Sequence, residues 1–271
     1  MMATGTAQDL EWRPVAAFVR MGWRRSSSDR ASAIGLVLLY WLVLLIFWGL
    51  WQATPLAELI ETGMTRPAVF RYLVITECIA MAAGYPYRTI EHDIQSGEIA
   101  AGMLRPIPYS IAMLADWLGQ TCHRLLLLSI AGAAAAIWLT GSVPFAFSVL
   151  PLLVLSMLLG CALVLLCQLQ IGYATTWMGT AAPVFWIWQK ALFVMGGLMI
   201  PLTLYPTGLR SVAELLPFAG MLYWPGSIAL AQSWTELVWP LGLQMFWLCV
   251  LGGLTWCVDD AAARRIALRG I

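Results

Sequence analysis

Charged side chains are scarce in this chain. They make up 11% of its 271 residues, less than half of the ~25% that is usual for a soluble domain. Hydrophobic residues fill 61% of the positions instead. This composition excludes an ordinary water-soluble globular protein and predicts one integral membrane domain over residues 1–271, with no separate soluble catalytic module.

Residue types that bind nucleotides and metals are also rare. Lys190 is the single lysine, and the chain lacks the Gly-x-x-x-x-Gly-Lys-[Ser/Thr] loop that cradles phosphates. The two histidines, His92 and His123, have no His, Cys or carboxylate partner at metal-ligand spacing. We therefore expect no metal site, no cofactor bound by this chain, no catalytic residue and no nucleic-acid partner.

Long apolar runs dominate what is present. A helix needs about 20 apolar residues to cross the ~30 Å hydrocarbon layer of a bilayer. We find six runs of about that length: Ser32–Trp51, Pro67–Pro86, Ile111–Leu139, Phe145–Gln168, Tyr173–Ile200 and Leu237–Val258. The sequence thus predicts an all-α integral membrane protein with six transmembrane helices.

Arginines are distributed unevenly around these runs. They cluster before the first run, after the last run and between the second and third: Arg13, Arg20, Arg24, Arg25 and Arg30; Arg264, Arg265 and Arg269; Arg88 and Arg105. The connections on the other side carry only Arg66 and Arg210. Because cytoplasmic loops are enriched in Arg and Lys, both termini and the central polar segment are predicted to be cytoplasmic.

Two further segments are amphipathic or broken rather than spanning. Residues 10–25 place Trp12, Val19 and Trp23 on one helical face and arginines on another. This predicts a helix lying in the membrane interface, with a cytosolic helix packed on protein as the alternative. Residues 201–235 are apolar but interrupted by prolines, which predicts short re-entrant or interface-lying helices on the external side.

The polar segment 87–109 separates the second and third runs. Tyr87–Gln95 can continue the second helix, and a short helix over Glu98–Leu104 would follow, with Ser96 as its N-cap and Arg105-Pro106 as its stop. Apolar side chains would then stand beside charged ones: Ile94, Ile99, Met103 and Leu104; Glu91, Asp93, Glu98 and Arg105. Apolar side chains surrounded by charged ones suit docking into a groove on a soluble protein. The alternative is an ordinary solvated loop.

A few polar side chains fall inside the runs. Glu77 lies in the second run and Lys190 in the fifth, where Trp186 and Gln189 or Lys190 share a helical face. An ionised group at that depth costs at least ~2.5–3.5 kcal/mol, so it should face protein or a water-filled path. Glu77, Trp186, Gln189 and Lys190 could therefore line a substrate path, or Glu77 and Lys190 could form a pair. Arg71, Asp116 and Arg124 lie nearer to run ends, where snorkelling explains them.

Three strings resemble a known family. Asp93-Ile94-Gln95-Ser96-Gly97-Glu98-Ile99 and Leu104-Arg105-Pro106 resemble the segment after the second helix in permease subunits of type-2 ATP-binding-cassette (ABC) exporters. The string Gly196-Gly197-Leu198-Met199-Ile200-Pro201-Leu202 also resembles this class. With the arrangement of runs, the resemblance covers essentially the whole chain and points to a poorly characterised branch.

This resemblance implies a mechanism that the residues alone do not indicate. A cytoplasmic coupling helix would contact a separate nucleotide-binding ATPase subunit, which would bind ATP and Mg. The matching positions are Glu91, Asp93, Ile94, Gly97, Glu98, Ile99, Leu104, Arg105 and Pro106. The chain itself would be no enzyme but a multi-pass permease of the bacterial inner membrane, surrounded by lipid and paired with a second copy or a sister permease. It would export an amphipathic substrate such as a lipid-linked molecule, drug or peptide.

Two other functions fit a polytopic membrane protein. An intramembrane lipid-modifying enzyme would need a clustered nucleophile, acid–base pair or metal site, and the histidines are isolated. A secondary transporter would need broken helices in corresponding halves of the chain, whereas the strongly broken segment lies just before the last run. Both remain alternatives.

Overall fold

The computed structural model describes residues 12–54, 64–104, 107–231 and 237–269, which are helical and contain no strand. The longer elements are α1 (Trp12–Ser28), α2 (Arg30–Ala53), α4 (Arg66–Ala82), α5 (Pro86–Ser96), α7 (Tyr109–Thr140), α8 (Leu150–Tyr173), α10 (Ala182–Met195), α11 (Thr207–Leu215) and α13 (Val238–Arg269). Short elements are α6 (Glu98–Met103), α9 (Thr175–Met178), α12 (Trp224–Ile228), the 3-10 turns η1 (Phe147–Val149) and η2 (Leu202–Leu204), and the π-helix η3 (Ala219–Tyr223). The all-α prediction is confirmed.

Five helical stretches are long and apolar enough to cross a membrane. They are Arg30–Ala53, Arg66–Ser96, Tyr109–Thr140, Phe147–Met178 and Val238–Ile266. The predicted fifth span, Tyr173–Ile200, is instead divided by a turn, because Gly179 adopts φ +79° and ends α9. The remaining helix, α10, has 14 residues and a length of about 21 Å, so a sixth full span is not confirmed.

Helix α4 lies at the centre of the bundle. Its side chains are apolar nearly all round and mostly buried, as expected for a helix that neighbours enclose on every side. It contacts α2, α7, α8 and α12. The Tyr40 hydroxyl of α2 donates to the Val74 carbonyl of α4 at 2.7 Å, which fixes these two helices together inside the apolar layer.

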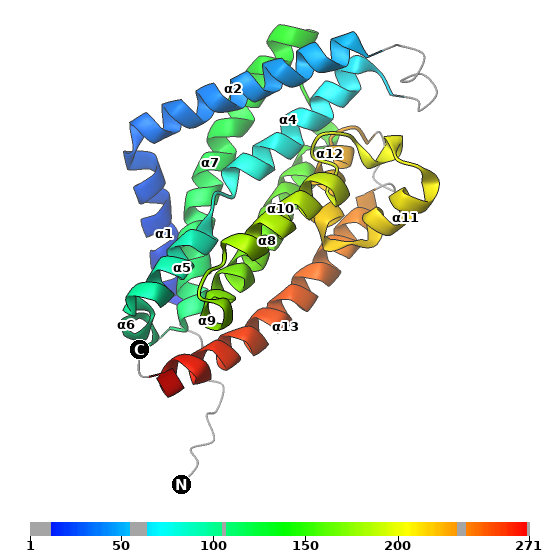
Figure 1. Cartoon of the computed structure of the whole chain (residues 1–271). Helices are drawn as coiled ribbons and strands as arrows, with labels where there is room; N and C mark the ends of the chain where they lie inside the picture. The colour runs from blue at the N-terminus through cyan, green and yellow to red at the C-terminus, as the bar shows by residue number, and fades with distance from the viewer. Residues whose placement is uncertain (1–11, 55–63, 105–106, 232–236, 270–271) are drawn as a thin grey trace.

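The elements segregate toward two ends of the molecule (Figure 1). At one end, which we call the α6 end, lie α5, α6, α9 and the C-terminal part of α13, while α11 and α12 lie toward the other, the α11 end. The predicted break of residues 201–235 into short helices is present in the described part, 201–231. Residues 232–236 lie outside the described part of the chain.

Helix α1 packs along α7 rather than standing apart. A Cβ at Gly22 would lie 1.9 Å from the Asp116 carbonyl oxygen, and a Cβ at Gly119 would lie 2.0 Å from that of Val19. Only glycine permits this approach of two backbones. The protein-packed alternative therefore describes one face of α1, its arginines remain exposed, and its place in the membrane interface stays a prediction.

Candidate functional site

The polar segment between the second and third spans folds as two short helices. It is not a continuation of α4, because Gly84 at φ +65° separates α4 from α5. A second left-handed glycine, Gly97 at φ +80°, ends α5 and starts α6. The prediction of Ser96 as N-cap is therefore wrong by one residue, because only glycine adopts this φ without strain. The Ser96 hydroxyl still accepts from the Glu98 amide at 3.4 Å.

The segment's isoleucines face inward. Ile94 and Ile99 are 7% and 0% exposed and belong to a buried cluster with Ile90, Leu169 and Tyr173. The prediction that they are exposed docking side chains is wrong, because α5 packs on α8 and both isoleucines join a buried cluster with residues of α7, α8 and α13. Leu104 is 88% exposed, as predicted, and its docking role stays a prediction. The Met103 side chain and residues Arg105 and Pro106 lie outside the described part.

Glu91 joins α5 to the start of α10. Its Oε1 accepts from the Thr180 hydroxyl at 2.6 Å and from the Ala181 amide at 2.9 Å. A carboxylate is favourable there because the amides at the start of a helix lack partners within the helix. The Gln95 side-chain amide donates to the Gly179 carbonyl at 2.9 Å. Glu91 is thus a tether within the protein rather than the free docking charge that the sequence predicted.

Two aspartates hold the other side of the segment. Asp93 Oδ2 accepts from the Tyr109 hydroxyl of α7 at 2.6 Å. Asp259 of α13 accepts from the Ser110 hydroxyl at 2.7 Å and also from the Tyr173 hydroxyl. These bonds join α5 to α7, and α7 to α8 and α13. Sequence reasoning missed Thr180, Ser110 and Asp259, since no local spacing connects residues so far apart in the chain.

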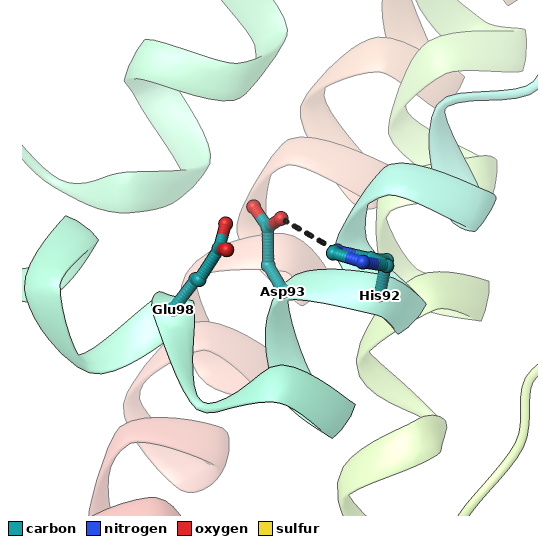
Figure 2. A group of neighbouring side chains, drawn as sticks. All are labelled: His92, Asp93 and Glu98. Carbon is teal, nitrogen blue, oxygen red and sulfur yellow. Dashed lines mark ion pairs between the residues drawn. The ribbon is translucent and has the colours of Figure 1, made fainter.

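The outward face of the segment carries charge. His92 and Glu98 are exposed, and the ligand atoms of His92, Asp93 and Glu98 lie within 4.8 Å of one another. Figure 2 shows this group, in which His92 Nδ1 lies 3.8 Å from Asp93 Oδ1. Sequence spacing did not reveal it, because the Gly97 turn brings Glu98 back toward Asp93. We call His92, Glu98 and Leu104 the α5–α6 surface.

Helix α10 presents an aromatic and basic face. Trp186 and Ile187 are 57% and 73% exposed, and Lys190 is exposed between them and the end of the helix. The Lys190 ammonium lies 5.8 Å from the Trp186 ring centroid, which confirms that these residues share a face, while Gln189 is half-buried. On the inner side, Phe185 stacks on Tyr87 of α5 with ring centroids 4.1 Å apart, so α10 and α5 contact each other directly.

Glu77 and Lys190 are not brought together. Glu77 is 5% exposed on the enclosed helix α4, whereas Lys190 lies on the open face of α10. Among the ion pairs of the described residues, none joins them. The pair that the sequence allowed is therefore absent.

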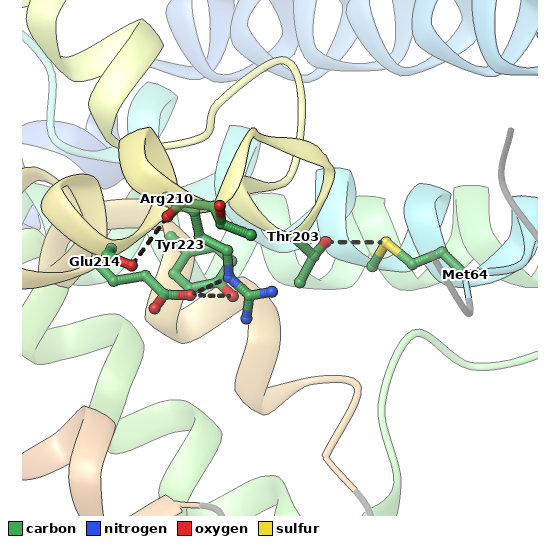
Figure 3. Close-up of polar contacts among 7 residues, drawn as sticks. Met64, Thr203, Arg210, Glu214 and Tyr223 are labelled. Atoms are coloured by element: carbon green, nitrogen blue, oxygen red, sulfur yellow. Dashed lines mark hydrogen bonds and ion pairs between the residues drawn. The ribbon is translucent and has the colours of Figure 1, made fainter. Parts of the chain in front are cut away.

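A polar cluster lies at the α11 end (Figure 3). Arg210 Nε and the Tyr223 hydroxyl both donate to Glu214 Oε1, at 2.8 and 3.2 Å. Burial raises the pKa of Tyr223 to about 12, so its hydroxyl stays protonated and remains a donor at neutral pH. The Thr203 hydroxyl donates to Met64 Sδ at 3.4 Å. These contacts join η3 to α11, and η2 to the residues just before α4.

Comparison with known protein families gives a match over most of the chain. A family model described as "ABC-2 family transporter protein" matches residues 38–265. The matched range begins within α2 and ends near the end of α13, so it contains the α5–α6 surface, α10 and the α11 end. A search of curated proteins found no match.

Proposed function

The chain belongs to the ABC-2 family of transporter proteins, and from this premise we propose that it is the permease subunit of an ATP-driven exporter. In this proposal the α6 end faces the bacterial cytoplasm, as the arginine distribution indicates, and a separate ATPase subunit supplies the energy. Family membership favours transport over an intramembrane enzyme or a secondary transporter.

The observation that carries the proposal is the construction of the α5–α6 segment. Ile94 and Ile99 are buried on its inner side, Glu91 and Asp93 bond it to neighbouring segments, and Leu104 and Glu98 are both exposed, Leu104 at 88%. A segment anchored on its inner side that exposes one apolar side chain together with charged ones suits contact with a partner protein. We assign the ATPase contact to His92, Glu98 and Leu104, with Arg105 and Pro106 following in the chain.

The tethers provide routes for transmitting movement of the ATPase subunit. Glu91 links α5 to the start of α10, and Asp93 links it to α7. The Gly84 break allows the segment to tilt relative to α4, since hinges are a few residues that absorb backbone rotation. ATP-driven closure of the partner would thereby move α10 and α7 while α4 stays enclosed.

The exposed face of α10 is the proposed substrate path. A lysine exposed to lipid inside the membrane costs at least ~2.5–3.5 kcal/mol, so Lys190 and Trp186 should be covered by a second permease or by a water-filled path. A face with Trp186, Gln189 and Lys190 suits an amphipathic substrate, because indole and ammonium groups contact its apolar and anionic parts. Glu77 is buried in this state, so a substrate would reach it only after the helices move.

The test is ATP hydrolysis and transport by the permease with its ATPase partner in reconstituted vesicles. We expect the double variant Glu98→Arg, Leu104→Ala to insert normally but to lower transport per ATP hydrolysed at least ~10-fold, because loss of a docking hot spot is worth ~1–2 kcal/mol or more. Leu215→Ala, an exposed leucine of α11, is the matched control and should leave coupling unchanged. Full coupling in the double variant would refute the assignment.

A further inference from the structure

A polar cavity of about 220 Å³ lies where α1 meets α2, against α7. Its polar lining includes Arg25, Ser26, Ser32, His123 and Arg124. The proposed transport mechanism uses none of these residues. The cavity is smaller than the ~300–1,000 Å³ of sites for drug-sized ligands, so it suits a small polar group rather than a whole amphipathic molecule.

The lining carries more positive than negative charge. Arg25 donates to Asp116 at 2.9 Å, but its side chain is 62% exposed, so other N–H groups of its guanidinium remain free. The carboxylate in the lining is that of Asp29. One of its oxygens accepts from the Ser32 amide at 3.0 Å as the N-cap of α2. An anion would therefore meet two guanidinium groups and one carboxylate that is already engaged.

Arg124 is the residue that most needs an anion. It is half-buried, and its hydrogen bond goes to a neutral partner, Gln120 Oε1, at 3.3 Å. Within the described parts of the chain, no carboxylate lies within ion-pair distance of it. Arg124 lines the cavity. A half-buried cation without a counter-charge is costly unless a ligand or water compensates for it.

The position of the Arg124 guanidinium is constrained. Its Cζ lies 5.6 Å from the Trp117 ring centroid, and its Nη1 lies so close to Gly84 that a Cβ there would be 2.4 Å away. The group is thus held between an aromatic ring and the backbone at the α4–α5 break. A donor held in place in this way loses little conformational entropy on binding.

The cavity lies where polar surface gives way to apolar surface. No charged residue follows Arg30 in α2 or Arg124 in α7. The non-polar wall of the cavity consists of Ala33, Leu36 and Leu127 from these apolar stretches. Next to it on α2, Ile34 and Leu38 are 62% and 65% exposed. A ligand with a charged head and apolar chains would satisfy both walls.

We propose that this cavity binds the phosphate of an anionic membrane lipid. Arg124 and Arg25 hold the phosphate oxygens through charge-assisted hydrogen bonds, the Ser26 and Ser32 hydroxyls lie beside it, and the acyl chains follow the exposed face of α2. The lipid is a resident ligand of the permease and not its transported substrate. A test of this lipid site therefore does not depend on whether the proposed transport function is correct.

The test is equilibrium binding of a fluorescent short-chain phosphatidylglycerol to the delipidated full-length chain in detergent. We expect saturable binding that Arg124→Gln weakens at least ~10-fold, since a hydrogen bond to a charged group contributes ~1.5–3 kcal/mol. Arg124→Lys should retain part of the affinity. Arg71→Gln is the matched control, because Arg71 is half-buried on α4 toward the α11 end and should leave binding unchanged.

A second variant removes the cavity and keeps both arginines. Ala33→Phe would fill the space beside Leu36 and should also weaken lipid binding at least ~10-fold. It tests the site if the Arg124→Gln variant fails to fold. Unchanged binding in either variant that folds normally would overturn the site. Equal competition by phosphatidylcholine would overturn the requirement for an anionic headgroup. Displacement by inorganic phosphate at the same concentration would assign the cavity to a soluble anion instead of a lipid.

Discussion

At the scale of single residues, the structure separates carboxylates that hold the protein together from those that face outward. Glu91 accepts two hydrogen bonds at the start of α10, whereas Glu98 is exposed on the next short helix. Their sequence context is similar, since both stand in one polar segment beside isoleucines. Their contributions to stability should nevertheless differ, because Glu91 bonds a distant segment whereas Glu98 is exposed.

This difference gives a paired prediction. Glu91→Ala should lower the midpoint of thermal unfolding by about 2–6 °C, since each of its two hydrogen bonds contributes ~0.5–1.5 kcal/mol. Glu98→Ala should leave it unchanged within error, as surface substitutions stay within ~0.5 kcal/mol. Unfolding of the two purified variants in detergent, followed by circular dichroism, measures both. Equal midpoints would show that the Thr180 and Ala181 contacts contribute nothing.

At the scale of elements, the break between α4 and α5 governs where the coupling segment lies. Gly84 holds a left-handed conformation at φ +65°, and a Cβ there would meet Arg124 Nη1 at 2.4 Å and Trp117 at 2.9 Å. The break also receives the Gln168 side-chain amide, which donates to the Gly84 carbonyl at 3.0 Å. A single glycine thus positions α5 relative to α4, α7 and α8.

Replacing this glycine tests the hinge. Gly84→Ala should destabilise the protein by about 1–3 kcal/mol, through backbone strain and displacement of Arg124, and should speed hydrogen exchange in α5 and α6. Gly35→Ala is the control, because a Cβ at Gly35 in α2 would meet nothing within 4 Å. There the change should be neutral or stabilising by up to ~1 kcal/mol. Identical exchange in α5 and α6 for both variants would contradict the hinge.

At the scale of the whole molecule, one protomer leaves the α10 face uncovered. Lys190 and Trp186 are exposed on it, while α2 exposes an apolar face suited to lipid. If a second copy covers α10, a cysteine at Ile187 should cross-link two chains in native membranes. In a two-fold interface the residues near the axis meet their equivalents in the other copy, and Ile187 is the most exposed of the hydrophobic side chains named on this face.

The experiment uses a chain whose own cysteines have been replaced, because Cys249 and Cys257 are exposed. Ile187→Cys should give a covalent dimer under mild oxidation, and Leu38→Cys on α2 should give none. The two side chains are comparably exposed, at 73% and 65%, so reactivity alone would treat them alike. Dimer formation at Leu38 and not at Ile187 would move the interface from α10 to α2.

Part of the site could be predicted from local sequence. The short helix after Gly97, the exposed Leu104 and the shared face of Trp186 and Lys190 follow from turn chemistry and from helical spacing, which act over a few residues. The burial of Ile94 and Ile99 could not be predicted in this way. It depends on α8, which the chain reaches only after all of α7.

The sequence by itself determined that this chain is a helical membrane protein, because apolar length and the scarcity of charge are local properties that only a bilayer satisfies. The tertiary structure decided which polar groups face inward. It shortened the fifth predicted span to α10, turned Glu91 from a docking charge into a tether, paired Asp116 with Arg25 and left Arg124 at a cavity with no ion pair to a described carboxylate. These outcomes depend on contacts between distant segments, and such contacts exist only once the helices have packed.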